Sequence, residues 1–301
     1  NHPADFPAEQ RRNLAITDIF EPGSSFKFVT AAGALEENIV SAEDKFFCEW
    51  GKYRTGGRIL HDYKSYGELS FQEVVERSSN IGMAKVAQLL SEELLYDYIK
   101  DFGFGQPTGI DLPGEVVGII RKPSRWSATS ISSIPMGQEV AVTPIQLLSA
   151  VSAVANDGVL LKPKIIKSIQ HRDGQVIKIY PTQKVRRVIS TQTAQSLKQI
   201  LAGVVENGTG KKAKVPGYKT AGKTGTAQKA KPQGGYYQRK YVSSFIGFVP
   251  ADRPVISILV VLNEPYPRYF GGTVCAPVFK NIAVETLRYL KMSNDEIKRI
   301  N

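Results

Sequence analysis

A serine and a lysine near the start of this chain have the spacing of a nucleophile and its base. Ser24 and Lys27 follow the break Pro22-Gly23 and open a run with helical periodicity, Phe28, Ala31, Ala32 and Leu35. Residues i and i+3 are neighbours on one helix face. A serine hydroxyl attacks only when a base removes its proton, and a lysine can be that base when burial or a second cation lowers its pKa. Lys223 is the candidate for that cation.

Two further short motifs accompany this pair. Ser78-Ser79-Asn80 and Lys223-Thr224-Gly225-Thr226 each occur once, and the three motifs come in the order Ser24, Ser78, Lys223. Alone, each has an ordinary interpretation as a helix cap, a polar loop or a strand end. Together they match the ordered signature of penicillin-binding proteins and class A β-lactamases.

At these residues the chain resembles the transpeptidase domain of class B penicillin-binding proteins, and the division-type branch most. The flanking segments strengthen the resemblance, which extends over nearly the whole chain: 12–27, 221–228 and 269–279. It implies one domain, 1–301, with an α+β fold in which helices flank an antiparallel sheet. A mainly helical subdomain is expected at 30–140, and the sheet-bearing part at 141–301 together with 10–29.

The resemblance also implies catalytic roles. Ser24 would attack the carbonyl of a D-Ala-D-Ala peptide bond while Lys27 takes its proton. Ser78, with Lys223 close by, would relay a proton to the leaving D-Ala amine. Asn80 would hold Lys27 and the substrate amide by hydrogen bonds.

Substrate binding is assigned to the strand that carries the third motif. The resemblance implies that Thr224, Gly225 and Thr226 bind the substrate, with the two threonines and the charge of Lys223 on its terminal carboxylate. The backbone N–H groups of Ser24 and Thr226 would form the oxyanion hole. No cofactor and no metal are expected, because the only histidines are His2, His61 and His171.

Two related functions share all three motifs: a β-lactam sensor and a serine β-lactamase-type hydrolase. Class A β-lactamases deacylate with a glutamate and a water, but their usual Glu-x-x-Leu-Asn segment is absent from this sequence. The stretch 136–139, leading to Thr143-Pro144, is similar to penicillin-binding proteins instead. We therefore expect Glu139 to be structural, the acyl-enzyme to await an amine, and penicillins to inhibit for long periods.

The composition bounds the remaining possibilities. The chain has 301 residues, is 42% hydrophobic and carries a net charge of +11, which favours acidic partners. The basic stretch 211–240 suits nucleic acid, but no nucleic-acid-binding motif accompanies it, so nucleic acid is not expected as a partner. The segment 217–224 matches a phosphate-binding loop, but its flanks suit neither the strand nor the helix that such a loop requires.

The expected elements follow from periodicity and turn residues. We predict strands at 14–19, 218–227, 242–249 and 255–262, a hairpin of 165–170 with 176–180, and irregular structure at 39–69. Helices are expected from Ser24 to about 38, from a capping box at Ser70 to 77, and at 81–90, 92–101, 144–157, 191–205 and from Pro277 onward. Cys48 and Cys275 are expected to be buried free thiols.

The chain begins abruptly compared with the family. The resemblance implies an upstream membrane anchor and pedestal, then a helix and two strands of the catalytic sheet, so we expect a fragment of a longer protein. It further implies a location on the extracytoplasmic face of the bacterial membrane. Expected partners are peptidoglycan stem peptides, β-lactams as covalent inhibitors, and, for the full-length protein, a membrane glycan polymerase and divisome proteins.

Overall fold

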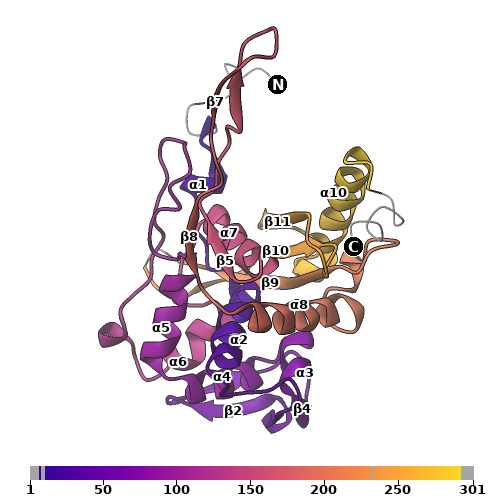
Figure 1. Cartoon of the computed structure of the whole chain (residues 1–301). Coiled ribbons are helices and arrows are strands. Elements are labelled where there is room, and N and C mark those ends of the chain that lie inside the picture. Colours follow the sequence, from indigo (N-terminus) through magenta and orange to yellow (C-terminus); the bar gives the residue numbers. More distant parts are fainter. Residues whose placement is uncertain (1–6, 8–10, 232, 293–301) are drawn as a thin grey trace.

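A three-stranded antiparallel sheet forms the centre of the computed structural model, which describes residues 7, 11–231 and 233–292 (Figure 1). Its strands lie in the order β11 (Ile256–Asn263), β10 (Tyr236–Val249) and β9 (Ala221–Ala230). The register pairs Thr226 with Ser243 and Ser244 with Val261. All three strands were predicted, and the meander they form confirms the α+β expectation.

Helices cover both faces of this sheet. Phe245 and Val249 of β10 belong to a core cluster shared with α10 (Ala276–Tyr289), and the Phe245 and Phe279 rings lie 4.8 Å apart. The alternate residues Ile246 and Phe248 belong to a second cluster, shared with α2 (Lys27–Glu36), α7 (Pro144–Ala155) and α8 (Thr191–Glu206). This alternation is the period-two pattern of a strand buried on both sides.

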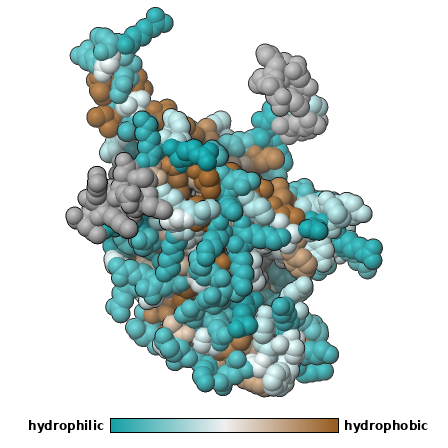
Figure 2. Space-filling model, turned by 90° about the vertical axis from the view of Figure 1, so that its right-hand side faces the viewer, coloured by the Kyte–Doolittle hydropathy of each residue, from teal (hydrophilic) through white to brown (hydrophobic). Residues whose placement is uncertain are grey.

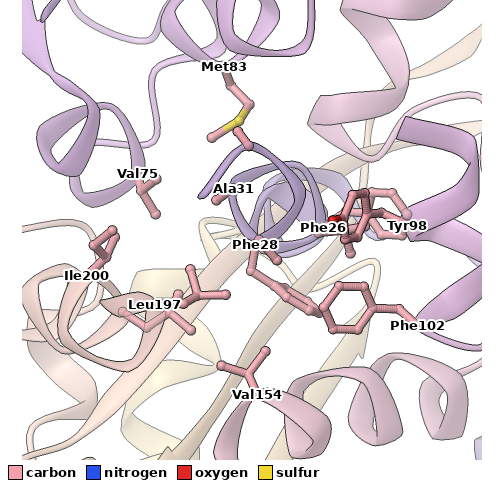
Figure 3. Packing of buried hydrophobic residues seen from close by; sticks show 14 of the residues in the cluster. Phe26, Phe28, Ala31, Val75, Met83, Tyr98, Phe102, Val154, Leu197 and Ile200 are labelled. Carbon is pink, nitrogen blue, oxygen red and sulfur yellow. The ribbon is translucent and has the colours of Figure 1, made fainter. Parts of the chain in front are cut away.

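Helix α2 lies at the centre of the larger hydrophobic core cluster. Its residues from Lys27 to Ala34 are all buried, and side chains from α4, α5, α7 and α8 surround it (Figure 3). Phe28 packs edge-on against Phe102 with ring centroids 5.6 Å apart. Because close-packed side chains surround α2 on every side, the turn that precedes it has little freedom to move.

The mainly helical part contains α3 (Phe71–Glu76), α4 (Asn80–Leu90), α5 (Glu92–Asp101) and α6 (Ser130–Ser133). The predicted capping box is present, since Ser70 Oγ accepts from the Glu73 backbone amide and the Glu73 carboxylate accepts from the Ser70 backbone amide. A short non-helical turn separates α3 from α4, and Ser78 lies in this turn. The subdomain boundaries at 30–140 and 141–301 stay predictions.

Two sequence-based expectations about local structure are wrong. Residues 14–19 form no strand: Asn13 accepts a hydrogen bond from the Ala15 amide and caps the short helix α1 (Leu14–Thr17). The stretch 39–69 is not irregular throughout. It holds two small antiparallel ladders, β1 (Lys45–Phe47) with β4 (Glu68–Ser70) and β2 (Lys52–Thr55) with β3 (Arg58–His61).

An arm projects from the body of the molecule at the top of Figure 1. Strand β5 (Val159–Leu161) pairs with β8 (Lys184–Arg187), and β6 (Ser168–Gln170) pairs with β7 (Val176–Ile179), which confirms the predicted hairpin. Hydrophobic atoms stay exposed along this arm between hydrophilic ones (Figure 2), including those of Ile177 and Ile179. None of the described helices combines the length and the hydropathy that a bilayer crossing requires.

Candidate active site

Ser24 lies on a 3-10 turn, Gly23–Phe26, that leads directly into α2. Gly23 has a positive φ of 57°, and a Cβ there would stand 3.1 Å from Ala227 Cβ and 3.3 Å from the Thr226 carbonyl carbon. The turn therefore packs closely against strand β9, held also by a 3.1 Å hydrogen bond from the Gly23 amide to the Gly137 carbonyl. Ser24 itself is half-buried, and the turn that carries it packs against Thr226 and Ala227. The oxyanion hole from the Ser24 and Thr226 amides stays a prediction.

Lys27 is fully buried and reaches the second motif. Its Nζ lies 2.6 Å from the Ser78 carbonyl oxygen, 3.2 Å from Ser78 Oγ and 2.8 Å from Asn80 Oδ1. Burial lowers the pKa of Lys27 to about 7, and the nearby Asp62 carboxylate opposes part of that effect. A large share of Lys27 is thus neutral near pH 7, as a general base must be.

Lys223 approaches Ser78 from the sheet. Its Nζ donates to Ser78 Oγ over 2.8 Å, and burial together with the charge of Lys27 lowers the pKa of Lys223 well below its usual value. Ser78 Oγ therefore accepts from two lysines, which leaves its own proton available to another acceptor. Ser78 also has a φ of 60°, a strained conformation for a residue with a side chain. The three sequence motifs thus meet at this hydroxyl.

The strand residues after Lys223 are held by two residues that the sequence analysis did not identify. Thr224 Oγ1 lies 2.8 Å from Thr209 Oγ1, and Thr226 Oγ1 accepts from the Gly271 amide over 3.0 Å. Both contacts join segments distant in sequence, so no local pattern signals them. They fix the rotamers of the two threonines expected to bind the substrate carboxylate.

Gly225 is required by the close approach of this strand to the nucleophile turn. A Cβ at position 225 would lie 2.2 Å from Ser244 Oγ and 2.7 Å from the Pro22 carbonyl oxygen. We expect Gly225→Ala to push the Ser24 turn away from β9 and to slow acylation by a fluorescent penicillin by roughly 100-fold, the scale of losing one oxyanion donor. Adding Ser244→Ala should restore only part of the rate, because the Pro22 carbonyl is backbone. A single variant that acylates at nearly the wild-type rate would contradict this packing argument.

Glu139 makes hydrogen bonds within the scaffold around the nucleophile turn. Its carboxylate accepts from Ser130 Oγ over 2.7 Å, and its backbone amide donates to Glu21 Oε1 over 2.9 Å. These bonds tie the segment after Gly137 to the residues just before Ser24. They fit the expectation that Glu139 is structural, and they add Glu21 to the residues that sequence reasoning missed.

Asp62 was also missed. Its carboxylate accepts from Ser79 Oγ over 2.6 Å and from the backbone amides of Asn80 and Ile81. The adjacent His61 carbonyl accepts from Asn80 Nδ2 over 2.9 Å. The Ser78–Asn80 motif is therefore held by hydrogen bonds to His61 and Asp62 at the end of β3. These two residues carry no recognisable sequence signal.

Other chemistries find no support in this geometry. The stretch 217–224 leads into strand β9 rather than a helix, so its match to a phosphate-binding loop is a coincidence. Among the residues that the structure describes, no group of three or more His, Cys, Asp or Glu side chains could hold a metal ion. Cys48 and Cys275 are both free and buried, as expected.

The Lys27 environment makes acylation depend on pH. A protonated Lys27 cannot accept the Ser24 proton, so the rate should fall as the pH drops below the Lys27 pKa of about 7 and level off above it. The second-order rate constant for a penicillin, measured from pH 5 to 9, checks this. A flat profile across that range would show that Lys27 does not act as the base.

Comparison with known proteins identifies the family of this chain. Residues 1–283 match the family described as the penicillin binding protein transpeptidase domain. The chain is 41% identical over 293 residues to stage V sporulation protein D of Bacillus subtilis, covering 95% of this chain and 45% of that protein. It is 33% identical over 298 residues to the peptidoglycan D,D-transpeptidase FtsI of Escherichia coli, covering 99% of this chain and 48% of that protein.

A solved structure shares the fold. Penicillin-binding protein 3 of Mycobacterium tuberculosis, complexed with aztreonam, superposes with a TM-score of 0.85 at 36% identity, covering 93% of this chain and 65% of that one. The chain thus spans about half the length of these relatives and two thirds of that structure. The resemblance found in the sequence is confirmed, and the chain belongs to the family of penicillin-binding protein transpeptidase domains.

Proposed function

We propose that this chain is a serine D,D-transpeptidase that cross-links peptidoglycan stem peptides through an acyl-enzyme at Ser24. The observation that carries the proposal is the convergence of Lys27 and Lys223 on the Ser78 hydroxyl, beside the turn that holds Ser24. Two buried lysines around one serine hydroxyl are costly to maintain, and such perturbed groups concentrate at functional sites.

The roles follow from the placement of these groups. Ser24 Oγ attacks the carbonyl of the penultimate D-Ala and gives its proton to Lys27, forming an ester with the enzyme. Ser78 passes its own proton to the departing D-Ala amine and is reprotonated through the lysines that donate to it. An incoming amine then attacks the ester, loses its proton through the same groups and frees Ser24.

A β-lactam would enter the same first step. Its ring amide would acylate Ser24, but the amine released by ring opening stays tethered and blocks the acceptor. The aztreonam complex of the Mycobacterium tuberculosis relative supports this part of the proposal. We therefore propose β-lactams as covalent inhibitors of this chain.

Transfer is favoured over hydrolysis because the sequence lacks the Glu-x-x-Leu-Asn segment with which class A β-lactamases deacylate. Glu139 makes scaffold contacts: its carboxylate accepts from Ser130 Oγ, and its backbone amide donates to Glu21. A peptide ending in D-Ala-D-Ala, incubated with and without a D-amino acid as acceptor, tests this. We expect D-Ala release together with an aminolysed product. Release with hydrolysis alone would indicate a hydrolase, and acylation by penicillin without D-Ala release would indicate a sensor.

The cellular setting is proposed from the family. The substrate lies outside the cytoplasmic membrane, so we place this domain on the extracytoplasmic face, held by a membrane segment outside this chain. Its relatives include both a sporulation protein and an FtsI. A role in septal wall synthesis, beside a membrane glycan polymerase and divisome proteins, is the proposal that the division-type resemblance favours.

A further inference from the structure

Asp62, the residue that follows strand β3, contacts the Ser78–Asn80 motif. Asp62 accepts three hydrogen bonds from consecutive residues of that motif and of α4: Ser79 Oγ at 2.6 Å, the Asn80 amide and the Ile81 amide at 3.2 Å. The Asp62 amide in turn donates to the Gly51 carbonyl over 3.2 Å, which anchors the aspartate to the neighbouring turn.

This arrangement makes Asp62 part of the start of α4. Ser79 is the N-cap, and its Oγ accepts from the Gly82 amide over 2.9 Å while donating to Asp62. A carboxylate at a helix N-terminus satisfies unpaired amides and is favoured by the helix dipole. Asp62 accepts from the Asn80 backbone amide and the His61 carbonyl accepts from Asn80 Nδ2, and in this arrangement Asn80 Oδ1 accepts from Lys27.

We propose that Asp62 is a positioning residue for acyl transfer, whose carboxylate holds the Ser78–Asn80 turn against Lys27 and supplies a negative charge near the Lys27 amine. The inference rests on the proposed function. It assigns Asp62 no contact with substrate or with Ser24. Its effect reaches the reaction through Ser78, Asn80 and the charge on Lys27.

The charge matters because it favours the protonated form of Lys27. Lys223 is a neighbour of the Lys27 amine on β9, Cys48 and Asp62 are its neighbours in the helical part, and the Asp62 carboxylate opposes the lowering of the Lys27 pKa by burial. Around Asp62 itself lie Cys48 and Tyr66, whose pKa values are raised, chiefly by burial and in part by Asp62. Removing the Asp62 charge should therefore let Lys27 lose its proton at lower pH.

The test compares Asp62→Asn with Asp44→Asn. Asp44 is a matched control, because it also caps a turn in the same part of the chain, accepting from the Ser41 amide at 2.9 Å and from Ser41 Oγ at 2.8 Å. It makes no hydrogen bond to the active site. The measurement is the second-order rate constant for acylation by benzylpenicillin from pH 5 to 9, with thermal unfolding recorded for each protein.

We expect Asp62→Asn to lower the plateau rate roughly 10- to 100-fold, the scale of losing one or two hydrogen bonds to a charged group. The acid limb of its pH profile, where the acylation rate falls as Lys27 becomes protonated, should also move to lower pH. A purely structural role would not produce this shift. Asp44→Asn should keep both the wild-type plateau rate and the wild-type position of the acid limb. A rate within threefold of wild type, or a lower rate with an unmoved limb, would overturn the proposal.

Ser79→Ala keeps the test decisive if Asp62→Asn proves unstable. It removes the hydroxyl that donates to Asp62 and accepts from the Gly82 amide but leaves the Asp62 carboxylate in place, so it should slow acylation by a smaller factor, and wild-type rates would contradict the proposal. Where both variants fold, their effects should be less than multiplicative, because they break the same contact. The wild-type chain in the same assay separates the two claims: if it forms no penicillin adduct, the proposed function fails rather than the role of Asp62.

Discussion

Replacing Ser24 with alanine should abolish covalent labelling by penicillins and all release of D-Ala. The adjacent Ser25 cannot take its place, since it is buried and directs its hydroxyl to the Pro22 carbonyl over 2.7 Å. Without the nucleophile, no ester forms and the later steps have no substrate. Labelling with a fluorescent penicillin, followed by denaturing electrophoresis, checks the first part, and a D-Ala assay checks the second.

Ser25→Ala is the matched control for this prediction. It removes a hydroxyl one residue away and should still give a labelled protein, with a modest loss of stability from the lost hydrogen bond, about 1 kcal/mol. Persistent labelling of the Ser24 variant would show that another residue is acylated. Loss of labelling in both variants would mean that the turn, rather than the hydroxyl at 24, had been disrupted.

Replacing Lys27 with alanine should slow acylation by roughly 100- to 10,000-fold, the usual contribution of a general base. The variant should also lose the pH dependence expected for the native chain, because the group whose pKa burial lowers to about 7 is gone. Stability should fall less than for an ordinary buried truncation, since the deletion also removes an amine that is costly to bury. Stopped-flow measurement of the acylation rate at several pH values checks both effects.

Lys85→Ala serves as the comparison. Lys85 is also a lysine of the helical part, paired with Glu49 at 2.6 Å and with the Phe47 carbonyl at 2.7 Å, and it makes no hydrogen bond to the motif residues. Its removal should leave the acylation rate unchanged. If the Lys27 variant lost less than tenfold, the base would have to be another group, and Lys223 would be the next to test.

The first and third motifs could be placed on elements from the sequence, whereas the Ser78 motif lies in a break between two helices. The apolar spacing after Lys27 predicted α2, and the segment 242–249 was predicted as the strand β10, which carries the partners of Thr224–Thr226. The order of the three motifs along the chain then identified them as one signature. They meet at Ser78 Oγ because α2 and β9 pack against the break between α3 and α4.

The errors come from short elements whose stability depends on distant partners. In 39–69 the ladder β1–β4 pairs Lys45 with Ser70, and three-residue strands have too little length to show a period. At 14–19 the apolar spacing mimics a strand, but the Asn13 cap gives a helix instead. The local sequence pattern does not show whether a helix cap or strand pairing stabilises such a segment more.

The supporting residues were missed for the same reason. Asp62 meets Ser79 across 17 positions, Thr209 meets Thr224 across 15, and Glu21 meets the Glu139 amide across 118. A single Asp, Thr or Glu in a loop has no distinctive spacing. Only the packing of α3, α4 and β9 around α2 brings these side chains to the motifs.

The central claim is that Ser24 forms a long-lived acyl-enzyme. Intact-protein mass spectrometry after incubation with benzylpenicillin, followed by peptide mapping of the adduct, tests it most directly. We expect one added mass equal to the drug, located on the peptide at Ser24 and retained for hours after excess drug is removed. An adduct on another residue, no adduct on a folded protein, or loss of the adduct within minutes would contradict it.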